Sequence, residues 1–397
     1  MADMTPENPH AEGLAVFTMG FRPFFLMGSL WAVAAMALWL MSLSGALALP
    51  TVFDPVSWHS HELLFGYLSA ILAGFLLTAV PSWTGRPALT GGTLASLAML
   101  WVVGRVAVVM SEMLPAGLVA VVDLAFPICL VGFVLREITT AGNWRNLIIV
   151  GMMIAFIVGN ALFHYEAAQG VYAAQGYGAR LGLAAAIMMV AVVGGRITPA
   201  FTRNWLSQQG SPVIPAPPMQ TFDKVSLLVL LIALVSWVWG PEHPIVGGLL
   251  VGAGGLHLAR LSRWAGHRTL RQPLVAVLHV AYLFLPLGAV ALGVSILAPG
   301  LIGPADAQHF WMAGAIGLMT LAVMTRATLG HSGRALHANA GTLVIFAAIV
   351  VAVAARLFAG IAPTLMYTVS GAAWMTAFGG FALIYGPMLL GRKITNT

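Results

Sequence analysis

Charged residues are the scarcest class in this chain of 397 residues. Only 8% of them are Asp, Glu, Lys or Arg, whereas 60% are hydrophobic. Soluble domains contain roughly 25% charged residues, so the composition excludes an ordinary soluble protein. The mean hydropathy of +0.93 indicates an integral membrane protein.

Cysteine is nearly absent as well. The single Cys129 lies inside an apolar run, which excludes an intrachain disulfide and a thiolate metal cluster. Any bound metal must therefore depend mainly on histidine, carboxylate or methionine. No C-x-x-C-H sequence occurs, which excludes covalent c-type haem. The absence of a GxxxxGK[ST] phosphate loop argues against an ATP-driven pump.

Long apolar runs fill most of the chain. A helix needs about 20 apolar residues to cross a bilayer, and twelve runs are long enough. We therefore predict an all-α, polytopic membrane protein of about twelve transmembrane helices. They cover residues 24–48, 59–81, 91–111, 115–135, 146–165, 178–198, 223–240, 244–264, 273–298, 308–330, 338–360 and 364–390.

The basic side chains predict the orientation of these helices. With the N-terminus inside, every Lys and Arg except Arg105, Arg180 and Arg356 falls at an inner end. This is the positive-inside pattern, so the pI near 9.9 reports membrane topology rather than nucleic-acid binding. We expect both termini in the cytoplasm, with an arm at 1–23 that has no evident cleavable signal and a tail at 391–397.

One proline-rich interruption suggests an internal division. Residues 206–222 contain four prolines and would join two six-helix halves, 24–205 and 223–390, of a single transmembrane domain, 24–390. A weaker pattern recurs every four runs. The second, sixth and tenth runs end in "LLTAVPSWTGRP", "VVGGRITPAFTRNW" and "LAVMTRATLGHSGR", which hints at a three-times-four arrangement.

Histidines mark the first candidate site. "WHSHELLFG" at 58–66 places His59, His61 and Glu62 at the outer start of the second run, where polar groups are costly and point to function. His164 ends the fifth run and His309 begins the tenth, at the same predicted depth. We expect an outer metal centre built from His59 or His61, His164 and His309. Glu62 beside it would relay protons or act as a ligand.

Helical phase limits how this motif can bind an ion. Residues three apart share a face, so His59 and Glu62 should point together. His61 is turned roughly 200° from His59, so the two histidines would serve different partners unless the first turn unwinds. Gly66 and Gly74 continue this helix as a small-residue ridge, which suits either close helix packing or a planar cofactor.

A second candidate site lies deeper in the chain. His257 and His279 fall inside the eighth and ninth runs. They are either hydrogen-bonded packing residues or axial ligands of a b-type haem. Arg196, Arg203 and Arg326 would pair with the haem propionates, or they reflect topology alone.

Several motifs resemble those of the NnrS family, in the same order. They are "GFRPFFL" at 20–26, "WHSHELLFG" at 58–66, "GFLLTAVPSWTG" at 74–85, "GGRITPAFTRN" at 194–204 and "GLMTLAVMTRATLGHSGR" at 317–334. Leu63 departs from the methionine that we associate with the family. The resemblance implies a bacterial inner-membrane protein that contains haem and copper and is linked to nitric oxide, nitrosative stress and denitrification. The motif match also adds His331 to the candidate residues.

Three functions remain open at this point. The first is a haem and copper protein that binds nitric oxide or, with quinol as electron donor, reduces it as an oxidoreductase. The second is a transporter of metal or small solutes, which would need a polar cavity in mid-membrane, yet only Asp123 lies well inside a run. The third is a sensor or accessory subunit that binds nitric oxide without turnover.

Overall fold

The computed structural model describes residues 14–391, and within them it contains twelve helical spans and no β-strand. The predicted all-α, multi-pass membrane fold is therefore confirmed. The spans are α1 (Phe21–Leu43), α2–η2–α3 (Pro55–His61, Glu62–Tyr67, Leu68–Thr84), α4 (Gly91–Val109), α5 (Ala116–Thr140), η4–α6 (Trp144–Asn146, Leu147–Ala168), α7–η6–α8 (Tyr177–Met189, Val190–Gly194, Gly195–Gln208), α9 (Thr221–Trp239), α10 (Pro244–Ser262), α11 (Pro273–Leu297), α12–η8–α13 (Pro304–His309, Phe310–Leu318, Met319–His331), α14 (Ala340–Leu357) and α15 (Pro363–Leu390).

The predicted ends differ from the observed ones where polar residues continue a helix. The sixth span was expected to end at 198 but runs to Gln208, because α8 continues through "TPAFTRNWLSQ" after the apolar run stops. Helix ends depend on backbone hydrogen bonds as well as hydropathy. The first span begins at Phe21, inside the predicted arm 1–23. Residues 1–13 of that arm and residues 392–397 of the predicted tail lie outside the described residues.

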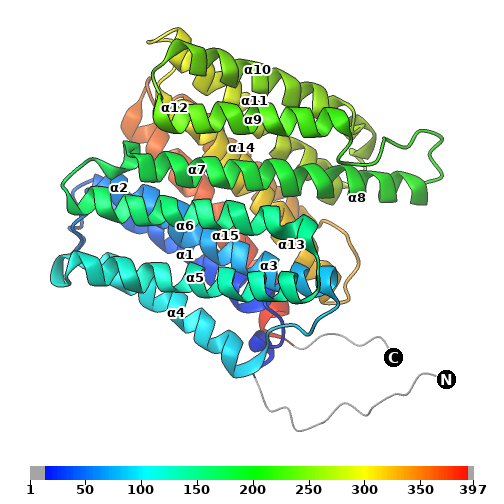
Figure 1. Cartoon of the computed structure of the whole chain (residues 1–397), viewed down its shortest axis with the longest axis horizontal. Helices are drawn as coiled ribbons and strands as arrows, with labels where there is room; N and C mark the ends of the chain where they lie inside the picture. Colours follow the sequence, from blue (N-terminus) through cyan, green and yellow to red (C-terminus); the bar gives the residue numbers. More distant parts are fainter. Residues whose placement is uncertain (1–13, 392–397) are drawn as a thin grey trace.

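Three spans form the centre of the molecule. In the most apolar stretch of the second, sixth and tenth spans, 72% of the residues are buried, a larger share than in any other described span. Each also contains a π-helical segment, η2, η6 or η8, and α7 contacts both η2 and η8. The four-helix spacing of the sequence pattern thus matches three equivalent central helices. Figure 1 shows α4 at one edge of the helix array and α10 at the other, with α3 and α7 between.

Small residues on two of the spans serve mainly helix packing. Gly74 lies against the Phe25 ring, where an added Cβ would come within 2.6 Å of it. Gly254 lies against the Pro286 carbonyl of α11 at 2.9 Å by the same measure. Small residues let membrane helices approach closely, so these positions fit helix contacts rather than a planar slot.

The first span packs against the last. α1 contacts α15, and Trp374 Nε1 on α15 donates to the Ala32 carbonyl at 3.1 Å. At the other end of the pair, Arg22 donates to the Gly391 carbonyl. The ends of the described chain therefore meet on one face of the helix array.

The close contact between α6 and α7 gives a test of this packing. A Cβ on Gly159 of α6 would lie 2.6 Å from the backbone nitrogen of Gly182 on α7, whereas a Cβ on Gly151 of the same helix would meet nothing within 4 Å. We expect Gly159→Val to destabilise the protein by about 1–3 kcal/mol through overpacking. Thermal unfolding in detergent would measure the change, with Gly151→Val as the matched control. Equal stability of the two variants would contradict the close contact.

Candidate functional site

A cluster of polar side chains is buried where five spans meet. We call it the buried polar cluster. Its side chains come from α1, α2, η2, α4, α5 and α6, and six of the seven are under 10% exposed. Because such groups are costly inside a bilayer, they are expected to satisfy one another. The cluster consists of Trp31, His61, Glu62, Arg105, Asp123, Asn160 and His164.

Arg105 joins the two carboxylates of the cluster. Its Nη1 donates to Glu62 Oε1 at 2.7 Å, and its Nη2 donates to Asp123. Trp31 Nε1 donates to the other Glu62 oxygen at 2.7 Å. Glu62, predicted as the catalytic group, therefore lies in a fully buried ion pair, and its proton or ligand role remains a prediction.

His61 lies between the two halves of the cluster. Its Nδ1 is 2.9 Å from Glu62 Oε1, and its Nε2 is 2.9 Å from Asn160 Oδ1. Asn160 uses its amide N–H to donate to Asp123, so its oxygen faces the imidazole as an acceptor. A neutral imidazole has only one N–H. The arrangement therefore has room for one further positive charge, either a second ring proton or a bound cation.

Three of these residues form a possible metal ligand set. His61, Asp123 and His164 each offer one ligand atom, and these atoms lie within 4.8 Å of one another. His164 Nε2 is 2.9 Å from Asp123 Oδ2. Two imidazoles and one carboxylate suit copper, zinc or iron. The cluster thus contains the donor types that the sequence predicted, with Asp123 in addition.

The local backbone explains how these groups converge. The π-helical segment η2 begins at Glu62, and such segments are frequent at functional sites. A Cβ on Gly66 would lie 2.6 Å from Arg105 Nη1 and 2.7 Å from Glu62 Oε2. Glycine at this position therefore makes room for the buried ion pair.

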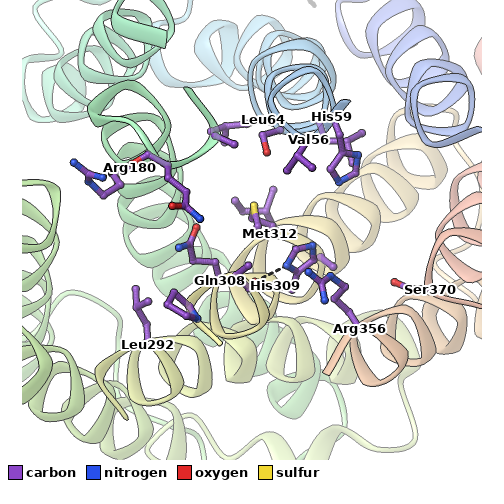
Figure 2. A pocket seen from close by; sticks show the side chains of 18 of the residues that line it. Val56, His59, Leu64, Arg180, Leu292, Gln308, His309, Met312, Arg356 and Ser370 are labelled. Atoms are coloured by element: carbon purple, nitrogen blue, oxygen red, sulfur yellow. Dashed lines mark hydrogen bonds between the residues drawn. The ribbon is translucent and has the colours of Figure 1, made fainter. Parts of the chain in front are cut away.

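A separate cavity of about 780 Å³, which we call the outer cavity, lies beside the start of the second span. It is lined by His59, His309 and Met312, and by Arg180 and Arg356. Figure 2 shows His59 and His309 entering it from two different helices, with Arg356 beside His309. The volume lies within the usual range of small-molecule and cofactor sites, roughly 300–1,000 Å³.

The two cavity histidines are held by different contacts. His59 stacks on Trp39 with ring centroids 4.1 Å apart, and its buried Nδ1 has no hydrogen-bond partner. His309 Nδ1 is 2.6 Å from the Ala305 carbonyl, so this nitrogen donates and Nε2 keeps its lone pair. A metal-binding histidine usually has such a second contact.

The structure divides the four outer histidines into two pairs. His61 and His164 lie in the buried polar cluster, whereas His59 and His309 line the outer cavity. The phase argument explains this, because residues two apart on a helix face nearly opposite directions. The expectation that His59 and Glu62 point together is not met, since His59 lines the outer cavity whereas Glu62 contacts His61 and Arg105.

The deeper histidines are engaged in hydrogen bonds. His257 uses both ring nitrogens, with Tyr282 Oη at 2.9 Å and the Ser226 carbonyl at 3.2 Å. His279 Nε2 contacts Thr202 Oγ1 at 2.8 Å, while its buried Nδ1 has no partner. His257 therefore fits the packing alternative better than haem ligation.

The remaining predicted residues are dispersed. His331 packs near Phe21, with ring centroids 5.4 Å apart. The three arginines expected at haem propionates contact different partners on or next to α8 and α6. Arg196 donates to Asn146 at 3.4 Å, Arg203 donates to the Pro215 carbonyl, and Arg326 lies 4.0 Å from the centroid of the Phe201 ring.

Arg105, Asp123 and Asn160 were not among the predicted site residues. Arg105 did break the positive-inside pattern, and Asp123 was the one acidic residue placed well inside an apolar run. A basic and an acidic residue that are both misplaced for topology are expected to pair. That signal would have found two of the three, whereas Asn160 gives no comparable sign.

The ion pair predicts a large effect for one substitution. We expect Arg105→Gln to destabilise the protein by about 3–5 kcal/mol, because it leaves buried charge uncompensated. Adding Asp123→Asn should restore part of that loss, since one carboxylate is then removed. Unfolding in detergent would measure both variants. If Arg105→Gln were as stable as the parent, the ion pair could not be a main support of the fold.

Nearly the whole chain matches one known protein family. Residues 15–393 match the NnrS protein family, which is nearly the full length of the chain. No curated protein matches it. The match agrees with the motif resemblance and with the twelve membrane spans. This membrane protein therefore belongs to the NnrS family, which is linked to nitric oxide and associated with metal and haem.

Proposed function

We propose that this chain is a haem b- and copper-binding protein of the bacterial inner membrane that takes up nitric oxide and reduces it to N2O. Family membership supports the link to nitric oxide. The observation that carries the cofactor part is the outer cavity, which has two histidines from separate helices in its wall. Nitric oxide is small and apolar and concentrates in bilayers, so a site among the spans meets it directly.

A haem fits the outer cavity better than it fits the surroundings of His257 and His279. Its volume is about 780 Å³, and the orphaned Nδ1 of His59 is a buried polar atom that still needs a partner. His309 has its Nδ1 engaged and its Nε2 available as a ligand atom. Arg180 and Arg356 in the same wall would meet propionates. We therefore propose that His59 and His309 would hold the haem.

The buried polar cluster fits copper by its donor set. His61 and His164 supply imidazole nitrogen and Asp123 supplies a carboxylate oxygen, and imidazole suits copper. The cluster has two carboxylates and one guanidinium. A cuprous ion would balance the remaining formal negative charge.

The reaction can be balanced with one reductant from the membrane. Two molecules of nitric oxide, two electrons and two protons give N2O and water, and oxidation of a quinol to a quinone supplies both electrons and both protons. The bound haem and copper would supply nitric oxide coordination and electron storage. The protein's own part is to hold the cofactors and to exclude water with apolar walls such as Leu64 and Leu292, seen in Figure 2.

The first test is an anaerobic absorption spectrum of the purified protein, oxidised and reduced, before and after nitric oxide is added. We expect a Soret band that shifts with nitric oxide, and N2O in the headspace when a quinol is supplied. His59→Ala and His309→Ala should each lose the band, because each removes a histidine that would hold the haem. His243→Ala is the control, since His243 caps α10 outside the cavity.

Each other outcome of this test has a definite meaning. The absence of a Soret band would refute haem binding, provided that the protein is folded and was expressed with haem available. A shifted band without N2O, despite a competent quinol, would leave nitric oxide binding and refute reduction.

Copper binding gives an independent test. We expect His164→Gln to lose bound copper but keep haem, because it removes one ligand of the buried polar cluster and none of the outer cavity. His257→Gln is the matched control, since His257 is an equally buried, hydrogen-bonded histidine elsewhere. Metal analysis of purified protein measures both. Unchanged copper in His164→Gln would contradict the assignment.

A further inference from the structure

A second, smaller cavity lies between the three central spans and is partly open to its surroundings. It has a volume of about 80 Å³ and is bounded by the second, sixth and tenth spans, with Ile149 of α6. Leu72, Val193 and Met319 are typical of its walls, and among the described residues Thr320 is the only polar side chain that lines it. We call it the apolar cavity.

The size and chemistry of the apolar cavity limit its occupant. A cofactor or drug-sized ligand needs roughly 300–1,000 Å³, so 80 Å³ is too small for a haem or a quinone. A water molecule needs several polar partners, and apolar cavities of this order stay dry and bind xenon or benzene. The fitting occupant is therefore a small apolar molecule such as a dissolved gas.

The apolar cavity is separated from the outer cavity by a thin partition. Ile316 lines both cavities, and Tyr67 lines the outer one. Tyr67 Oη is 2.6 Å from Thr320 Oγ1, which is itself 2.8 Å from the Ile316 carbonyl. Because the threonine hydroxyl has a single proton, which it donates to that carbonyl, the tyrosine must be the donor in their bond. The Tyr67 hydroxyl is thereby held at Thr320, which in turn contacts the Ile316 carbonyl.

The partition is built where the helices depart from regular α-geometry. Tyr67 is the last residue of η2, and Ile316 lies inside η8. A π-helical turn shifts the side chains that follow it relative to a regular helix. Tyr67 and Ile316 are both nearly fully buried.

We propose that the apolar cavity binds nitric oxide and passes it to the outer cavity through the Tyr67–Ile316 partition. This inference rests on the proposed function for the identity of the gas. The binding site itself depends only on the volume and the apolar walls of the cavity. A small apolar molecule would thus reach the cofactor site along apolar walls.

Xenon tests the binding site without any haem. A crystal of the full-length protein under xenon pressure should show xenon among the central spans in the parent and none in Val193→Phe, whose ring fills the cavity. Val121→Phe makes the same change at a position of α5 that is 68% exposed, and it should keep the xenon. An empty apolar cavity in the parent would overturn the proposal even if nitric oxide turnover were established.

Carbon monoxide tests the route. After flash photolysis of the reduced haem protein with carbon monoxide bound, we expect bimolecular rebinding to be several-fold slower in Val193→Phe and several-fold faster in Ile316→Ala, with Val121→Phe unchanged. Rebinding that stays the same in both cavity variants would overturn the route. A protein without haem would give no photolysis signal and would refute the proposed function, whereas the xenon result would still decide the site.

Discussion

The pairing of Arg105 with Glu62 and Asp123 is the interaction on which the rest of the site depends. Isolated charges inside a bilayer are costly, and each of these three is buried. Their mutual bonds draw α4 and α5 against the second span. The position of His61, and with it the separation of the two candidate cofactor sites, follows from that constraint, because His61 is bonded to Glu62.

The two sites differ in physical character. The buried polar cluster is small, closely hydrogen-bonded and charged, which suits a single ion or proton. The outer cavity is large and has mixed walls, which suits an extended cofactor with acidic groups. His59 and Ser60 of α2 line the outer cavity, whereas His61 of the same helix belongs to the buried polar cluster. One helical turn therefore supplies side chains to both sites. The phase difference between His59 and His61 makes this division possible.

The sequence predicted the number and places of the spans because apolar length is a local property, readable without knowledge of neighbours. It also identified His61 and His164 as candidate ligands. It could not show that Asp123 and Asn160 complete their surroundings, because helix rotation and contact between distant spans are tertiary properties. The same limit applies to His257, whose depth suggested ligation, whereas its two hydrogen-bond partners became visible only in the folded chain.

The contact between α1 and α15 has a consequence for biosynthesis. α1 leaves the ribosome well before α15, on which it packs, and its Arg22 donates to the Gly391 carbonyl. Until α15 is inserted, the apolar face of α1 and the Arg22 guanidinium lack these contacts. The bundle therefore cannot close during translation, and truncation before α15 would leave an open assembly exposed to membrane quality control.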